Sequence, residues 1–377
     1  MGNSTTAMPE GSSQQIVREL FFEQDVEVLA TSYKHGLLRS LAVLGRTLLF
    51  SRGESGLDAP LVPGSTIAVV FFPNELEAIR RAPPARLEVD RILAFDVHRL
   101  STVRRTLGLG GLARECVAFA RLAMREKGLR YLGRLTYPLL GWLMYRSLCV
   151  RLEGVRGLRV VTTNLQHPLS IGVAWAARQA GRDSVFYEHA TTPRLVFRDR
   201  GYRDCFVQFE HTGRMLVEHG VAPDRVHVLQ PPFAAGALQP TGPIRRVGVC
   251  VNVLDTIEAI EDITAVLRDR GLALTYRIHD ADPRVTELRR IADREGVELS
   301  NARDSRIETF LAAVDLVVVG NSNVIADALI AGRRVVYYWS GTPDMYDYYG
   351  LVSHYRIAAA HDAGTLRGVM ASLCDPA

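Results

Sequence analysis

Cysteine is scarce in this chain of 377 residues, and its thiols are odd in number and far apart: Cys116, Cys149, Cys205, Cys250 and Cys374. Because this spacing fits neither a disulfide framework nor a zinc site, we expect reduced, mostly buried thiols in a reducing compartment. Long apolar runs are lacking too. The nearest, at 135–145, is too short for a membrane span and lies between Arg134 and Arg146.

An excess of one charge is also missing. The formal net charge is +4 with a pI of 8.8, so no overall basic field calls for nucleic acid. The first residues have neither the basic start nor the apolar centre of a signal peptide. We therefore expect a cytoplasmic protein.

Three catalytic signatures are absent. The sequence contains neither a phosphate loop of the form G-x-x-x-x-G-K-S/T nor a G-x-S-x-G nucleophile elbow. The stretch "GLGGLA" at 108–113 lies in a helical pattern rather than after a strand, so it is not a dinucleotide fingerprint. These absences remove most support for nucleotide hydrolysis, serine hydrolase chemistry and hydride transfer.

What is present is the composition of a globular protein, with 47% hydrophobic and 23% charged residues. The polar residues 1–15 predict a disordered tail. A linker rich in proline, glycine and alanine at 231–243 predicts the boundary between a first domain, 16–235, and a second domain, 244–377.

Short β-branched and aromatic runs alternate with helical patterns in both domains. The first domain has strand patterns at 65–73, 91–97, 157–164, 183–190, 202–210 and 225–232, after a mixed pattern at 27–53. The second has them at 244–253, 272–280, 297–301, 315–321 and 334–339, with a last helix after His361. This alternation predicts an α/β protein with two Rossmann-like, doubly wound parallel sheets facing across a cleft.

Residues 100–150 form a helical insertion in the first domain. Between Ser101 and Val150 we count nine basic and two acidic residues, a net +7. One interpretation is a solvated helix face. The alternative is a patch at 101–150 that rests on the inner face of the cytoplasmic membrane, with Tyr137, Trp142 and Tyr145 at headgroup depth.

Polar residues directly after the strands are the candidate site residues, because ligands of open parallel sheets lie beyond the carboxyl ends of the strands. In the first domain these are Asn164 and His167, and then Glu188 and His189. A carboxylate beside an imidazole suits a general base, and structural charge pairing is the alternative. Neighbouring strand residues point to opposite faces, so only one of this pair faces the cleft unless the strand has ended.

In the second domain Asn252, Arg277 and His279 follow or end strands. Arg277 supplies a fixed charge, and His279 is able to donate to a phosphate oxygen. The following Asp280-Ala281-Asp282 either resembles the Asp-x-Asp of metal-dependent sugar transferases or caps the next helix.

The stretch Gly320-Asn321-Ser322-Asn323 comes between a strand and a helix. It is either a helix cap or a loop whose backbone N–H groups hold a phosphate. A cap needs one polar residue, and here three follow the glycine, which favours ligand binding.

Three stretches carry a resemblance to a known family: "EHGVAPDRVHVLQPPF" (218–233), "YRIHD" (276–280) and "GNSNVIADALIAGRRVVYY" (320–338). They resemble the GT-B glycosyltransferases, and within them the bacterial capsule transferases, polysialyltransferases and teichoic-acid polyol-phosphate transferases. The resemblance implies that His279, Asn321, Ser322 and Asn323 contact the donor phosphates and that Asp327 lies where many such enzymes keep a glutamate. Asp280 stands where the family has proline, and Asp327 is one methylene shorter than the usual glutamate.

The leading hypothesis is a metal-independent transferase with no cofactor, which moves a sugar from a nucleotide-activated donor to a hydroxyl of a surface glycan or lipid-linked acceptor. Asn252, Arg277, His279 and the loop with Asp327 would bind the donor; Asn164 and His167 would lie on the acceptor side, and Glu188 or His189 would be the base. The alternatives are a nucleotide-sugar 2-epimerase of the same architecture and a degenerate transferase acting as a membrane-associated assembly partner.

Overall fold

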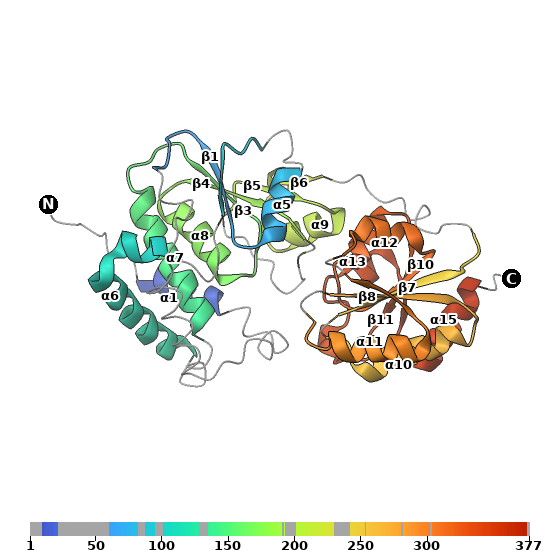
Figure 1. Cartoon of the computed structure of the whole chain (residues 1–377). Helices are drawn as coiled ribbons and strands as arrows, with labels where there is room; N and C mark the ends of the chain where they lie inside the picture. The colour runs from blue at the N-terminus through green and yellow to red at the C-terminus, as the bar shows by residue number, and fades with distance from the viewer. Residues whose placement is uncertain are drawn as a thin grey trace. The chain divides into compact units, whose positions relative to one another are not determined.

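A computed structural model describes residues 10–21, 60–81, 87–94, 101–127, 135–190, 192, 201–229, 242–252, 254–279, 282–301 and 304–374. The chain divides into two compact units, with the main break between Gln230 and Pro231. Unit 1 is residues 1–192 and 196–230, and unit 2 is residues 193–195 and 231–377. Each unit has a sheet and a hydrophobic core of its own (Figure 1).

Unit 1 contains a parallel sheet in the order β2-β1-β3-β4-β5-β6. Its strands are β1 (Thr66–Val70), β2 (Arg91–Ala94), β3 (Arg159–Thr162), β4 (Asp183–Tyr187), β5 (Asp204–Val207) and β6 (Val226–Val228). The central strands are buried along almost their whole length, as expected when helices cover both faces. The strand order reverses between β1 and β3, which pair in parallel.

The helices of unit 1 are α1 (Glu10–Leu20), α5 (Pro73–Arg81), α6 (Ser101–Lys127, kinked at Gly108), α7 (Thr136–Leu152), α8 (Pro168–Gln179) and α9 (Glu210–Glu218). Helices α1, α6, α7 and α8 pack into one core with the sheet (Figure 1). α7 and α8 touch at Gly141 and Gly172, where a side chain on either residue would overlap the backbone of the other helix. α7 is buried on nearly all sides because it lies among the other three helices.

Unit 2 contains a second parallel sheet in the order β12-β11-β10-β7-β8-β9. Its strands are β7 (Arg246–Val251), β8 (Ala273–Ile278), β9 (Glu298–Asn301), β10 (Leu316–Val319), β11 (Arg334–Tyr338) and β12 (Ala358–Ala360). Its helices are α10 (Ile257–Arg268), α11 (Val285–Glu295), α12 (Ile307–Ala313), α13 (Val324–Ile330), α14 (Leu351–Tyr355) and α15 (Ala363–Cys374). Here the order reverses between β7 and β10. The predicted fold class, two doubly wound Rossmann-like domains as in GT-B proteins, is confirmed, while their facing across a cleft stays a prediction.

Three expectations need correction or extension. Helix α1 begins at Glu10, so residues 10–15 are helical rather than part of a disordered tail; the helix forms because Ile16, Val17 and Leu20 anchor it in the core. Three further elements, α5, α14 and β12, have no predicted counterpart in the sequence patterns. The mixed pattern at 27–53 and Asp280 lie outside the described residues.

Two of the three aromatic residues proposed for a membrane surface are in the core. Trp142 is 4% exposed and Tyr145 0% exposed, so the prediction of headgroup contacts was wrong for these two rings. Tyr137 is partly buried and packs against His167, and its contact with headgroups stays a prediction. Among the described residues no helix is both long enough and apolar enough to cross a membrane, and each cysteine is a thiol rather than part of a disulfide.

Candidate functional site

The carboxyl edge of the first sheet gathers loops from β1, β3 and β4 around the point where the strand order reverses. Such a switch point is where doubly wound sheets bind ligands. Thr163 follows β3, Glu188 and His189 follow β4, and Glu75 stands in the first turn of α5 after β1.

Glu188 is completely buried, with 0% of its surface exposed. Its carboxylate accepts hydrogen bonds from the backbone N–H groups of Thr192 (3.1 Å) and Gln208 (2.7 Å) and from the Thr212 hydroxyl (3.0 Å). Burial raises the pKa of Glu188 to about 7, although these hydrogen bonds act to lower it. In this structure the Glu188 carboxylate ties loops together and has no exposed surface. Its role as a base stays a prediction.

Unlike Glu188, which is buried, His189 is partly exposed. Its Nδ1 lies 2.5 Å from the Thr163 carbonyl oxygen, which is able only to accept, so Nδ1 carries the proton. With Nδ1 as the donor, Nε2 is the ring nitrogen that is left for another partner. The role of His189 as a base stays a prediction.

Asn164 and His167 shape the start of α8. The Asn164 Oδ1 accepts from the N–H groups of Gln166 (2.8 Å) and His167 (2.9 Å), and the His167 Nδ1 accepts from Leu169 N–H at 3.4 Å. His167 is buried against the ring of Phe72, and burial lowers its pKa to about 3. His167 therefore caps α8 and has almost no exposed surface, and its acceptor-side role stays a prediction.

In unit 2, Asn321 joins three loops at the switch point. Its side-chain amide donates to the Met345 carbonyl (2.7 Å), and its Oδ1 accepts from the Tyr337 hydroxyl (2.9 Å) and the Tyr348 N–H (3.2 Å). Its backbone carbonyl accepts from the Asn252 side chain at 2.5 Å. Asn321 and Asn252 thus hold the loops after β7, β10 and β11 together, so their side chains face other protein groups rather than a donor.

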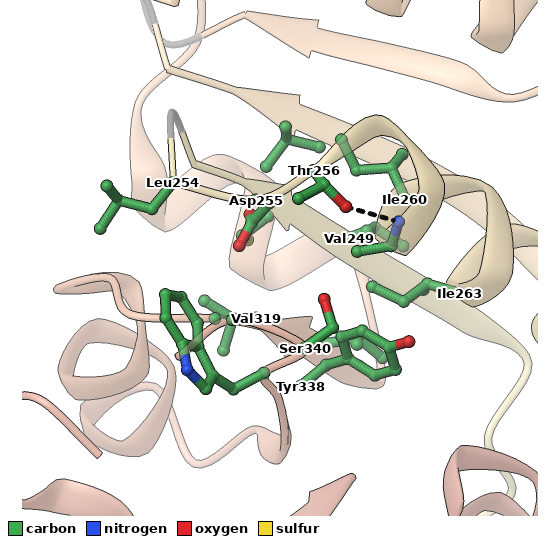
Figure 2. A pocket seen from close by; sticks show the side chains of 16 residues that line it. Val249, Leu254, Asp255, Thr256, Ile260, Ile263, Val319, Tyr338 and Ser340 are labelled. Carbon is green, nitrogen blue, oxygen red and sulfur yellow. Dashed lines mark hydrogen bonds between the residues drawn. The ribbon is translucent and has the colours of Figure 1, made fainter. Parts of the chain in front are cut away.

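Glycine is required at position 320 because a side chain there would overlap neighbouring atoms. A Cβ at this position would stand 2.6 Å from Asp255 Oδ1 and 3.3 Å from the Tyr338 carbonyl oxygen. Figure 2 shows Asp255 and Thr256 opposite Val319, Tyr338 and Ser340 in a pocket of about 20 Å³. That volume takes about one water molecule, so no nucleotide enters this crevice.

Arg284 clamps the loop after β7. Its guanidinium donates to both carboxylate oxygens of Asp282 (3.0 and 2.8 Å) and to the carbonyls of Asp255 and Asn252. Asp282 is thus an ion-pair partner. Within the described ranges no group of three or more histidine, cysteine, aspartate or glutamate side chains is arranged to hold a metal ion.

The remaining loop residues are less constrained. The Ser322 hydroxyl accepts from the N–H of Val324, the first residue of α13, at 3.3 Å, and the N-cap residue of that helix is Asn323. Asn323 makes no side-chain cap, and its Oδ1 is buried without a hydrogen-bond partner in the described part of the chain. His279 is exposed directly after β8.

Arg277 lies at the end of β8, where its position is fixed by two serines. Nη1 donates to the hydroxyls of Ser300 (2.9 Å) and Ser305 (2.7 Å), and Nη2 donates to the Ser305 carbonyl (2.8 Å). Its guanidinium stacks 5.4 Å from the centre of the Phe310 ring. These bonds use three of its five N–H donors and leave the planar group oriented.

Asp327 lies near Arg277, in the first turn of α13. Burial raises the pKa of Asp327 to about 6; Glu308 raises it further, and Arg277 opposes them. Beside Arg277 a pocket of about 390 Å³ opens between β8, β9, α11 and α12, and its lining includes Ile278, Ser300 and Phe310. This volume is within the usual range of small-molecule sites. Of the residues predicted to bind a donor, Arg277 and Asp327 are brought together, and Asn252 with Asn321 form a separate structural network.

Reasoning from the sequence missed Glu75, Thr163, Asp255 and Arg284. A signal was present for Glu75, since "FFPNE" ends a strand with proline and then places a carboxylate in the first helical turn. No comparable signal marked Arg284, whose partners come from the loops after β7 and β8.

The sequence matches no protein-family model and no curated protein. Similar solved structures include HepE of Anabaena in complex with UDP and glucose, with 17% identity over 82% of this chain and 90% of that one and a TM-score of 0.43. Another is a UDP-GlcNAc 2-epimerase from Neisseria meningitidis bound to UDP-GlcNAc, with 10% identity over 82% and 92% of the chains and a TM-score of 0.49. A third is the glycosyltransferase SnogD from Streptomyces nogalater, with 15% identity over 83% and 91% and a TM-score of 0.44. Likeness at this level concerns the fold and carries no conclusion about activity.

Proposed function

We propose that this chain is a GT-B glycosyltransferase that moves a sugar from a nucleotide-activated donor to a hydroxyl of a surface glycan or lipid-linked acceptor. In this proposal unit 2 binds the donor, with no metal ion neutralising its phosphates. Unit 1 presents the acceptor hydroxyl to His189.

The observation that supports donor binding is a pocket of about 390 Å³ between β8, β9, α11 and α12, whose lining includes Ser300, Ser305 and Phe310, the residues that orient the Arg277 guanidinium. Arg277 itself is 8% exposed, and its planar cation has unused donors that suit a phosphate, since it stabilises negative charge without reorganising. Exposed His279 lies two residues further along, directly after β8. We assign the phosphates to Arg277 and His279 and the nucleoside to the pocket.

A thermal-shift screen of the full chain against CMP, UDP and GDP tests donor binding. A nucleotide that binds the folded protein at 100 times its Kd stabilises it by about 2.7 kcal/mol. We expect one of the three to raise the Tm of the unaltered protein and of Arg290→Gln, which changes an exposed arginine of α11 outside the pocket. Arg277→Gln should lose the shift. If no nucleotide stabilises the protein, the degenerate, non-catalytic alternative is favoured.

Transfer itself is tested by incubating the protein with the stabilising nucleotide's sugar donor, with and without a glycan acceptor. We expect nucleotide release that depends on the acceptor, and His279→Ala should reduce it sharply while the Tm stays unchanged. Unchanged turnover in that variant would remove His279 from the donor site. An altered sugar formed from donor alone would favour the 2-epimerase alternative.

The basic helix α6 supports a peripheral membrane contact, although not through the aromatic residues first considered. Val117 is 50% and Met124 43% exposed, and both lie on the face that carries Arg114 and Arg121, seven residues apart in each pair. Apolar groups among arginines suit an anionic bilayer. We expect co-sedimentation with anionic but not zwitterionic vesicles.

The variant that tests this contact combines Arg114→Glu and Arg121→Glu. Each basic residue near such a surface contributes about 1 kcal/mol, so binding should fall at least about 25-fold for the pair. Arg290→Glu, an exposed charge reversal in unit 2, is the matched control. Equal loss in both proteins, or binding that does not depend on the lipid charge, would contradict the contact.

A further inference from the structure

The loop between β11 and α14 is fastened to the switch point of the second sheet on both sides of one residue, Tyr346. Before it, the Met345 carbonyl accepts from the side-chain amide of Asn321, in the loop after β10, at 2.7 Å. After it, the Asp347 N–H donates to the hydroxyl of Tyr337, in β11, at 3.0 Å. The loop after β11 therefore turns back towards the carboxyl end of β10, with Tyr346 between two anchored residues.

Asp347 fixes the far side of this turn. It is 2% exposed, and its Oδ1 accepts from the Val352 N–H and its Oδ2 from the Ser353 N–H, both at 2.9 Å, in the first turn of α14. Its φ of 51° is a left-handed conformation that is uncommon outside glycine. Such a conformation persists where the surrounding contacts hold it, so the turn that carries Tyr346 has a defined shape.

The side chain of Tyr346 is the open part of this turn. It is 41% exposed, whereas Tyr348, two residues later, is 8% exposed. The Tyr346 ring contacts the completely buried Tyr337, with ring centroids 5.4 Å apart and an interplanar angle of 81°. This edge-to-face contact orients the ring. Because a tyrosine that is oriented before binding loses little conformational freedom, Tyr346 presents a ready aromatic surface to a ligand.

The strand order places Tyr346 across the proposed phosphate position from the nucleoside pocket. The second sheet runs β11-β10-β7-β8-β9, with the pocket at β8 and β9 and Arg277 in β8. Since neighbouring strands are about 4.8 Å apart, the end of β10, to which the Tyr346 turn is fastened, lies roughly 10 Å from β8. A diphosphate joined to one sugar ring has a similar length. A donor laid along the carboxyl edge, with its phosphates at Arg277, therefore brings its sugar to Tyr346.

We propose that Tyr346 is a specificity-determining residue of the donor site, whose ring stacks on the C–H face of a pyranose in the donor. This inference rests on the proposed transferase function. The face of an aromatic ring carries negative charge and attracts the polarised C–H groups of a sugar ring. A polyol phosphate offers no flat ring and brings an anion to that negative face. Tyr346 therefore selects a sugar over a polyol phosphate, the other kind of donor used in the families that the sequence resembles.

Isothermal titration of the full chain compares each nucleotide with its sugar donor: UDP with UDP-glucose, GDP with GDP-mannose, and CMP with CMP-N-acetylneuraminate. Tyr346→Ala should raise the Kd of the donor about 2- to 12-fold, the range that one aromatic contact supplies, and leave the Kd of the nucleotide unchanged. Tyr346→Phe keeps the ring and should keep both values. An equal rise in both constants, or no rise for any of the three donors, would overturn the proposal.

The matched control for this titration is Ile330→Ala. Ile330 is another large apolar side chain of unit 2, 50% exposed, at the last residue of α13 and so at the opposite end of that helix from the Asn321 loop. Its replacement should change neither constant.

A second measurement covers the case in which Tyr346→Ala disturbs the turn. The Tyr346 ring resonances of the unaltered protein are identified by their loss in Tyr346→Phe. They are then followed by NMR during titration with methyl glucoside, with methyl mannoside, with glycerol 3-phosphate and with the three donors. A sugar ring should move them, and glycerol 3-phosphate should not. An equal response to glycerol 3-phosphate would overturn the preference for a sugar.

The outcomes separate this sugar contact from the proposed function. If a glycoside moves the Tyr346 resonances and no nucleotide binds, the contact is supported and the transferase proposal fails. If a nucleotide and its donor bind while the resonances stay in place, donor binding holds and the contact is wrong. If neither a sugar nor a nucleotide binds, both are wrong.

Discussion

The two asparagines on either side of Ser322 differ in how many hydrogen bonds their side chains make. The Asn321 side chain makes three hydrogen bonds, to β11 and to the loop that follows it. Asn323 makes no side-chain cap, and its Oδ1 has no hydrogen-bond partner among the described residues. Two residues of the same type, two positions apart, therefore do different work.

Replacing Asn321 by alanine should cost much more than replacing Asn323. The first change leaves the Met345 carbonyl and the Tyr337 hydroxyl buried without their partner, at about 1–3 kcal/mol for each unsatisfied group. The second should stay within about 0.5 kcal/mol. Urea unfolding monitored in unit 2 measures both, and equal losses would contradict the assignment of Asn321 as the loop junction.

Glu188 should make the stability of unit 1 depend on pH. Its pKa is about 7 in the folded protein and about 4.3 in an unfolded chain, so the folded state binds the proton more tightly. Its contribution is therefore fully present below about pH 4.3 and is lost as pH rises through about 7, up to about 4 kcal/mol. Unfolding measured from pH 4 to 8 should show a smaller decline in Glu188→Gln, and an identical decline would contradict the raised pKa.

Among the elements, the pair α7 and α8 forms the tightest helix contact in unit 1. Gly172 faces the Gly141 carbonyl so closely that the helices touch through their backbones. A β-carbon at Gly172 would have to push the two helices apart. The glycines here serve close approach rather than an unusual backbone conformation.

Gly172→Ala should lower the free energy of unfolding by about 1–3 kcal/mol, the cost of overpacking a dense core. Gly110→Ala is the matched control, because Gly110 also lies inside a helix but faces open space. That change should stabilise by up to about 1 kcal/mol, since alanine favours the helix. If both substitutions have the same sign, the backbone contact between α7 and α8 is not what requires glycine.

At the scale of the whole molecule, each unit has a core of its own, one around Trp142 and Tyr145 and the other around Tyr276 and Leu316. Separate cores predict separate cooperative units. Calorimetry of the full chain should therefore show two transitions, with Gly172→Ala lowering one and Asn321→Ala lowering the other. A combined variant should be additive within about 0.5 kcal/mol. A single transition shifted by both changes would show that the units unfold together.

The alternation of β-branched runs with helical periods was enough to predict both sheets, because each buried strand carries its own local signal. "TIAVV" of β1 and "LVVV" of β10 are continuous apolar runs, as central parallel strands require. The edge strand β12, "AAA", has no such run, and only its pairing with β11 makes it a strand. Helix α1 was missed for a similar reason: its first turns are polar, and its packing against α6, α7 and α8 supports the helix.

Which residues stand near the carboxyl ends of the strands was determined by the sequence alone, since that order follows from strand and helix periods. Which of them remain available was decided by tertiary structure. Glu188 and Asn321 are engaged by donors and acceptors from distant loops, and Arg277 is oriented by Ser300 and Ser305. Hydrogen bonding and burial depend on neighbours brought together by folding, so a local pattern names the candidates but not their partners.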